Sequence, residues 1–190
     1  MINTAKTAAA ASLAQRAHSG QLDKAGEPYV KHAFAVAEKM DDEDSTCAAL
    51  LHDVVEDTDF TLDDLRAIGM SEAVVEAVDL LTRGPDQDYF AYVLALRDHP
   101  IASKVKRADL EHNADLSRFK RLTSFDMRRR AKYLEALALL DGDVEGRVQP
   151  RCAARTRPRR CAETPCASPS MRSRFAGVMR AGRPRRSEMA

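Results

Sequence analysis

The sequence predicts an all-α fold, a bundle of roughly seven or eight helices, followed by a C-terminal tail. Alanine- and leucine-rich segments place apolar side chains at helical spacing, and runs of β-branched residues are few. No stretch alternates apolar and polar side chains over the length of a useful strand. Because 44% of the 190 residues are hydrophobic, the chain suffices for one globular domain with residues left over.

Capping residues and prolines define the first three helices. Asn3 or Thr4 caps the first helix, and Pro28 suits the first turn of the second. An acidic turn at residues 41–44 caps the third. These helices are predicted at about residues 4–18, 29–40 and 45–56.

The later helices have similar start and stop signals. Thr61 followed by Asp64 resembles a capping box, and Ser71 caps the next helix. A Gly-Pro pair within residues 83–86 breaks the chain, and Pro100 starts a further helix. The remaining helices are predicted at about residues 62–68, 71–81, 87–98, 100–113 and 124–140.

A change in composition separates a domain at residues 1–142 from a tail at residues 143–190. The tail is rich in Arg, Pro, Ala and Ser and lacks periodicity, so it is predicted to be disordered. Residues 141–190 carry a net charge of +7 and residues 1–140 a net charge of −6. The acidic body argues against nucleic-acid binding, whereas the basic tail could bind nucleic acid through counterion release.

Cysteine usage and hydropathy predict a cytoplasmic protein without membrane contact. The four cysteines match no paired zinc-binding spacing, and Cys47 lies on an apolar helix as a small hydrophobic residue. Nothing indicates disulfides, which is typical of a reducing compartment. No signal-peptide core or stretch of membrane-spanning length is found. The sequence leaves the oligomeric state open.

The pair His52-Asp53 is the strongest indication of a functional site. It lies in the apolar run of residues 48–55, and Glu56-Asp57 follows one turn later. Helical spacing would place all four side chains on one broad face. Burying ionisable groups in such surroundings costs free energy unless something binds them. A divalent metal is therefore predicted here.

Residues from two other predicted helices complete a metal site. His32 would approach from the second helix, and Asp109 and Asn113 are four residues apart on a later one. Two imidazoles and two carboxylates, from His32, His52, Asp53 and Asp109, suit Mn²⁺ or Fe²⁺, with Zn²⁺, Co²⁺ or Ni²⁺ as alternatives. Such a set leaves positions open for water and substrate, as catalytic sites do. The other histidines, His18, His99 and His112, are predicted to be core residues.

This combination resembles the HD-domain phosphohydrolase superfamily, above all the Rel/SpoT-type alarmone hydrolases and their small single-domain relatives. The resemblance covers roughly residues 5–140 and implies an HD-domain helical bundle in an enzyme of the stringent response. It also implies Mn²⁺ as the cofactor and the removal of 3′-pyrophosphate from guanosine tetra- or pentaphosphate. The matching segments are Ala17-His-Ser-Gly-Gln21, Gly26-Glu-Pro-Tyr-Val-Lys-His32, Ala48-Ala-Leu-Leu-His-Asp-Val-Val-Glu-Asp-Thr58 and Lys106-Arg-Ala-Asp-Leu-Glu-His-Asn113.

The resemblance implies a role for each matching residue. The metal would be held by His32, His52, Asp53 and Asp109. Glu56 and Asp57 would assist the attack of water. Asn113 would contact the nucleotide, and Lys24, Tyr29 and Lys106 are predicted to bind the substrate with it.

Two acidic residues depart from the alarmone-hydrolase pattern. Asp23 and Asp115 stand where the family carries basic residues, which removes positive charge from the predicted nucleotide site. One alternative is therefore an HD-type phosphohydrolase for another nucleotide or phosphate ester. A second alternative is a non-catalytic nucleotide-sensing module.

Overall fold

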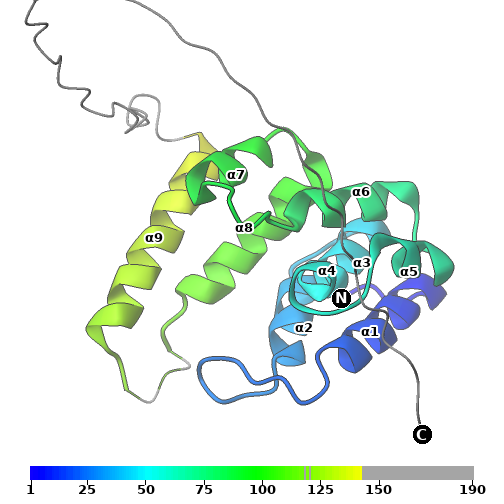
Figure 1. Ribbon diagram of the computed structural model, residues 1–190, viewed down its shortest axis with the longest axis horizontal. Coiled ribbons are helices and arrows are strands. Elements are labelled where there is room, and N and C mark those ends of the chain that lie inside the picture. Colours follow the sequence, from blue (N-terminus) through cyan, green and yellow to red (C-terminus); the bar gives the residue numbers. More distant parts are fainter. Residues whose placement is uncertain (118, 120, 143–190) are drawn as a thin grey trace, which may run out of the picture. The chain divides into compact units, whose positions relative to one another are not determined.

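Nine helices and no named strand are found in the part of the chain that the structure describes, residues 1–117, 119 and 121–142 (Figure 1). The structure is a computed structural model, and the predictions made for residues 143–190 lie outside the described residues. The all-α prediction is confirmed. The helices are α1 (Ala5–Ala17), α2 (Val30–Glu38), α3 (Glu43–Leu51), α4 (Val54–Asp57), α5 (Leu62–Ala67), α6 (Glu72–Leu81), α7 (Tyr89–Ala95), α8 (Pro100–Ala114) and α9 (Ser124–Asp141).

Side-chain caps explain where most helices begin. Thr4 caps α1, Thr61 forms a reciprocal capping box with Asp64 at α5, and Ser71 caps α6. At α8, Pro100 occupies the first turn while the His99 side chain accepts the Ala102 N–H at 3.1 Å. His99 is therefore a helix cap and not the core residue that was predicted.

The predicted continuous helix at residues 45–56 is wrong, because it is interrupted at His52 and Asp53. α3 begins at Glu43, capped by Asp42, and ends at Leu51. The His52 ring nitrogen Nδ1 lies 2.8 Å from the Ala49 carbonyl oxygen, a partner within the last helical turn. Asp53 is distorted to φ −104° and ψ −2°, after which α4 starts. The interruption places the two functional side chains in a turn at the end of a buried helix.

Helix α3 is the centre of the core. Every residue from Ser45 to Leu51 is buried, and α1, α2, α6 and α8 all pack against α3. Small residues such as Ala48 and Ala49, both fully buried, allow these neighbours to approach closely. Helix α9 packs on α7 and α8 at one side of the bundle (Figure 1). The position of the C-terminal end of α3, which His52 follows, is therefore fixed by contacts with four neighbouring helices.

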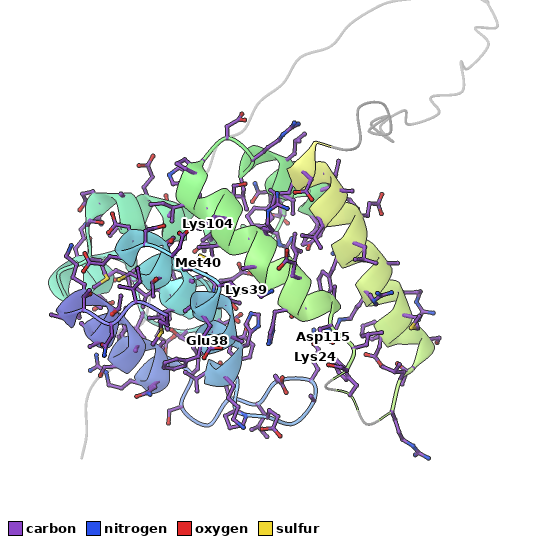
Figure 2. The ribbon with its side chains drawn as sticks, turned by 180° about the vertical axis from the view of Figure 1, so that it is seen from behind. Lys24, Glu38, Lys39, Met40, Lys104 and Asp115 are labelled. Atoms are coloured by element: carbon purple, nitrogen blue, oxygen red, sulfur yellow. The ribbon has the colours of Figure 1, made fainter. Side chains whose placement is uncertain are left out.

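Surface ion pairs join α2 and its following turn to α8. Lys39 Nζ lies 2.8 Å from a carboxylate oxygen of Glu111, and Lys104 contacts both Asp41 and Asp42. Figure 2 shows Lys39 and Lys104 on this face of the bundle. Exposed pairs of this kind contribute only about 0–1 kcal/mol each. These pairs connect α2 and α8, the two helices that carry the predicted metal ligands His32 and Asp109.

None of the described helices has the length and apolar character needed to cross a bilayer.

Candidate metal centre and nucleotide pocket

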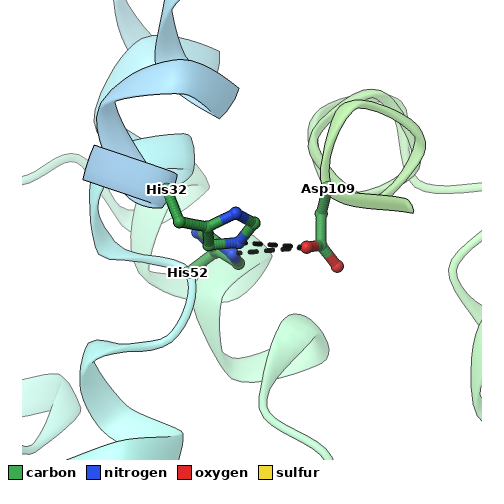
Figure 3. Close-up of side chains that lie close together, drawn as sticks. All are labelled: His32, His52 and Asp109. Carbon is green, nitrogen blue, oxygen red and sulfur yellow. Dashed lines mark ion pairs between the residues drawn. The ribbon is translucent and has the colours of Figure 1, made fainter. Parts of the chain in front are cut away.

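Three of the four predicted metal ligands converge from separate parts of the fold. His32 lies on α2, His52 follows α3, and Asp109 lies on α8 (Figure 3). Asp109 Oδ1 is 3.2 Å from His32 Nε2 and 3.9 Å from His52 Nε2. One ligand atom from each residue lies within 4.8 Å of the other two, which is compatible with a single metal ion.

The fourth predicted ligand, Asp53, lies at the edge of this group. Its Oδ2 atom is 3.0 Å from His52 Nε2 and 3.8 Å from His32 Nε2. The Tyr29 hydroxyl donates a hydrogen bond to the same oxygen. Burial and the adjacent Asp53 raise the pKa of Tyr29, so this hydroxyl remains a donor. Tyr29, predicted to bind substrate, thus orients a predicted metal ligand.

Both imidazoles are oriented through their Nδ1 atoms. His52 Nδ1 donates to the Ala49 carbonyl oxygen, and His32 Nδ1 lies 2.7 Å from Nδ1 of His112. These contacts leave each Nε2 atom facing the centre. His52 Nε2 is buried and lies within ion-pair distance of Asp53 Oδ2, at 3.0 Å, without a well-aligned hydrogen bond among the described residues. A metal ion could take the place of a proton on this nitrogen and pair with the same carboxylate.

His112 is a site residue that sequence reasoning missed. It was predicted to be a core histidine, but the structure places it against His32 with ring centroids 4.7 Å apart. Its position three residues after Asp109, on the same helical face, was a signal that could have been used.

The carboxylates change the proton affinity of His52. Burial opposes protonation of this imidazole, but Asp53 and Asp109 outweigh burial and raise the pKa of His52 to about 9. Burial likewise opposes ionisation of both carboxyls. His52 nevertheless holds the pKa of Asp53 below its usual range, and Lys106 does the same for Asp109. The carboxyls of Asp53 and Asp109 are therefore ionised, and their negative charge favours a cation between them, either a proton on His52 or a metal ion.

Two predicted substrate ligands contact Asp109 directly. Lys106 Nζ lies 2.9 Å from Asp109 Oδ2, and Asn113 Nδ2 donates to Asp109 Oδ1 at 2.5 Å. Lys106 is mostly buried and lies 5.3 Å from the centroid of the Tyr92 ring. Despite burial, Asp109 raises the pKa of Lys106, which therefore stays charged. Both residues also line a pocket beside the metal group, where they can contact a substrate.

The predicted catalytic pair lies on α4, beside the centre. Glu56 accepts a hydrogen bond from the backbone N–H of Arg83 at 2.9 Å, which ties α4 to the loop after α6. Asp57 is partly exposed, and burial together with Asp53 raises its carboxyl pKa. Both carboxylates line the same pocket as the metal group.

A pocket of about 440 Å³ opens from this centre, a volume within the range of small-ligand sites. Its walls include every residue of the predicted site except His52, which is buried beneath it. Several lining residues were missed by sequence reasoning, because they come from distant elements without a shared motif. These are Arg83, Tyr89, Tyr92, Phe119, Arg129, Lys132 and Tyr133.

Asp23 and Asp115, the two acidic residues that depart from the alarmone-hydrolase pattern, lie in different places. Asp23 lines the pocket, and its Oδ1 accepts hydrogen bonds from the backbone N–H groups of Ala25 and Glu27. Asp115 is not among the lining residues, and its side chain accepts from the Ser117 N–H at 2.8 Å. Figure 2 shows Lys24 and Asp115 at the same edge of the bundle. Only Asp23 therefore removes positive charge from the pocket wall itself.

Replacing Tyr29 by Phe should weaken Mn²⁺ binding while leaving the fold intact. The substitution removes the hydroxyl that holds Asp53, and residues that only orient a metal ligand typically change affinity or activity by ~10–100-fold. Isothermal titration with Mn²⁺ would measure the change. Tyr133→Phe, at another tyrosine of the pocket, is the matched control. Equal affinities in both variants would show that Tyr29 does not orient Asp53.

The metal-free protein should lose stability as the pH rises from about 6.5 to about 9. His52 has a higher pKa in the folded chain than its unfolded value of roughly 6.5, so its stabilising contribution is complete below that value and is lost as the pH passes about 9. Mn²⁺ would compete for the same nitrogen, so its affinity should rise over this window, by up to ~10-fold per pH unit. Thermal denaturation with EDTA and Mn²⁺ titrations across the window would measure both effects. An unchanged pH dependence in His52→Gln would contradict this assignment.

Comparison with known proteins gives consistent matches over the helical region. A family profile described as an HD domain matches residues 10–130. A GTP pyrophosphokinase of Streptomyces coelicolor is 34% identical over 120 residues, which cover 56% of this chain and 14% of that protein. A guanosine-3′,5′-bis(diphosphate) 3′-pyrophosphohydrolase of Haemophilus influenzae is 36% identical over 115 residues, which cover 53% and 17%. The matches thus span less than a fifth of the length of these curated relatives.

A solved structure is also similar. It is described as a metazoan ortholog of SpoT that hydrolyses ppGpp and plays a role in starvation responses. The TM-score is 0.62 at 25% sequence identity, over 77% of this chain and 89% of the other. The similarity therefore covers nearly all of that smaller protein.

Proposed function

The chain belongs to the HD domain family, and from this membership we propose that it is a metal-dependent phosphohydrolase that removes the 3′-pyrophosphate of guanosine 3′,5′-bis(diphosphate). One observation carries most weight. The Nε2 atom of buried His52 faces the carboxylates of Asp53 and Asp109, at 3.0 and 3.9 Å, and one ligand atom each of His32, His52 and Asp109 lies within 4.8 Å of the others. The names of the relatives support the substrate, since both a bacterial pyrophosphohydrolase and the SpoT ortholog act on this nucleotide.

HD domains are metal-dependent, and His32, His52 and Asp109 form a group that could hold the ion, with Asp53 beside them. We propose Mn²⁺, because mixed imidazole and carboxylate ligands suit this cation. When bound, it would lower the pKa of a water ligand and polarise a phosphoryl oxygen. The second nitrogen of each imidazole is already engaged, by Ala49 and His112, which would keep both rings in the orientation needed for binding.

The other predicted site residues would accept the proton of the attacking water or bind the nucleotide. Water attacks the phosphorus attached to the ribose O3′ atom and the O3′–P bond breaks, so that pyrophosphate carries the oxygen of water and the departing O3′ of GDP takes a proton. Glu56 and Asp57 are placed to accept the proton of the attacking water. Burial and the adjacent Asp53 raise the pKa of Asp57, which suits a group that accepts a proton. Lys24, Lys106 and Asn113 would hold the nucleotide.

Product analysis tests this proposal. Purified protein with Mn²⁺ and guanosine 3′,5′-bis(diphosphate) should release pyrophosphate and GDP, and His52→Ala should not. A panel of mononucleotides, assayed in parallel, covers the alternative of another nucleotide or phosphate ester, which Asp23 in the pocket wall favours. Release of inorganic phosphate from a different nucleotide would support that alternative.

The non-catalytic alternative makes a different prediction. A nucleotide-sensing module would bind guanosine 3′,5′-bis(diphosphate) without turnover, even with Mn²⁺ present. The ionised carboxylates of Asp53 and Asp109 favour catalysis, because their burial costs free energy that nucleotide sensing alone does not explain. Tight binding of intact nucleotide with no product would establish the sensing role.

A further inference from the structure

A group of cations forms part of the pocket wall away from the metal ligands. Arg83 follows α6, and Arg129 and Lys132 lie on α9. None of the three belongs to an element that carries a predicted metal ligand. The pocket therefore contains positive charge that the proposed chemistry does not use.

The charges of these three cations are only partly neutralised by neighbouring groups. Arg83 donates from its guanidinium to the Gln87 carbonyl oxygen at 3.0 Å. Arg129 lies 3.7 Å from Asp126, and its Nε atom is buried without a hydrogen-bond partner among the described residues. Within that same part of the chain, no carboxylate lies within ion-pair distance of Arg83 or Lys132.

Lys132 lies where an anion would be attracted. Its ammonium nitrogen lies 3.6 Å from the centroid of the Tyr89 ring, which fixes it at the pocket wall. Burial and the positive charge of Arg83 both lower its pKa. Like charges that repel one another in a partly desolvated wall are stabilised when an anion binds between them.

Lys106 cannot supply this positive charge alone. Its ammonium is already paired with Asp109, so part of its charge offsets the carboxylate that faces the metal. Asp23 further reduces the positive potential of the wall. Apart from Lys24, the cations of the wall left for an anionic group bound away from the metal are Arg83, Arg129 and Lys132.

We propose that Arg83, Arg129 and Lys132 form a second anionic subsite that takes the 5′-diphosphate of the nucleotide, while its 3′-diphosphate faces the metal ligands. This inference rests on the proposed function, which supplies a substrate with diphosphates at both ends. It makes Lys132 a specificity-determining residue. The pocket volume of about 440 Å³ suits a ligand that reaches both walls.

The test compares two substrates on the Mn²⁺-loaded protein. One is guanosine 3′,5′-bis(diphosphate), and the other is guanosine 3′-diphosphate, which lacks the 5′ group. In Lys132→Met, the ratio of their kcat/KM values should fall about fivefold, the effect expected for one partly exposed charge pair. Arg128→Met is the matched control, because Arg128 is exposed on the same helix and does not line the pocket. An equal ratio in wild type and Lys132→Met would overturn the subsite.

A binding measurement separates the subsite from the proposed reaction. GDP carries only the 5′-diphosphate, and its affinity for the Mn²⁺-loaded protein can be measured by calorimetry. A fivefold loss in Lys132→Met, but not in Arg128→Met, would support the subsite even if no pyrophosphate were released, in which case the proposed reaction alone would fail. Equal GDP affinity in both variants, or no saturable GDP binding by wild type, would overturn the subsite even if hydrolysis were observed.

Discussion

Replacing His52 by Ala should abolish Mn²⁺ binding and reduce pyrophosphate release by at least ~10³-fold, beyond the ~10–100-fold typical of residues that only orient a ligand. The ring nitrogen it removes is buried and faces both carboxylates. Without it, Asp53 and Asp109 lose a charge partner as well as a metal ligand. Calorimetric titration with Mn²⁺ and single-turnover product analysis would measure the two losses on the same preparation.

His99→Asn is the matched control for this experiment. His99 caps α8 outside the pocket, and Asn retains a side-chain acceptor for the cap. This variant should bind Mn²⁺ and release product like wild type. Full activity and bound metal in His52→Ala would eliminate the proposed centre, whereas loss of both in His99→Asn would indicate a general folding defect.

Replacing Glu56 by Gln or Asp57 by Asn should slow turnover by ~10²–10⁴-fold without removing the metal, because each change deletes a base that can accept the proton of water. The side-chain amide introduced by Glu56→Gln would still accept the N–H of Arg83, so the loop after α6 should stay in place. Single-turnover rates at saturating Mn²⁺ would show which carboxylate matters more.

The pH profile distinguishes the two carboxylates further. If Asp57 is the base, activity should fall as the pH drops through its raised pKa, and Asp57→Asn should lack this acidic limb. Glu76→Gln is a suitable control, because Glu76 is an exposed helical glutamate outside the pocket. Wild-type turnover in both Glu56→Gln and Asp57→Asn would remove the pair from the mechanism.

Local signals in the sequence predicted most of the helices and drew attention to the side chains that converge between them. Thr61 with Asp64, Ser71 and Pro100 mark helix starts that the structure confirms, because caps act within one turn. The interruption at His52 was not predicted. It involves a side-chain contact with Ala49 that apolar periodicity does not report.

The other site residues depend on tertiary contacts. His112 could not be linked to His32 without knowing how α8 packs on α2. Arg83 reaches the pocket from the loop after α6 and Arg129 from α9, and these segments share no motif with the metal ligands. The contact between Tyr29 and Asp53 spans 24 positions of the chain. Sequence patterns could therefore indicate the proposed metal ligands. They could not indicate the cations of the other pocket wall or the side chains that orient the proposed ligands.

In the proposed mechanism the carboxylate of Asp109 takes part in both metal binding and nucleotide binding, which would couple the two thermodynamically. Its Oδ1 atom faces the imidazoles, while its Oδ2 atom is paired with Lys106, which also lines the pocket. A nucleotide phosphate that draws Lys106 toward itself leaves more negative charge on Asp109 for a cation. By reciprocity, bound Mn²⁺ must then raise nucleotide affinity by the same factor as nucleotide raises Mn²⁺ affinity. Mn²⁺ titrations with and without GDP would measure that factor, and identical affinities would exclude the coupling.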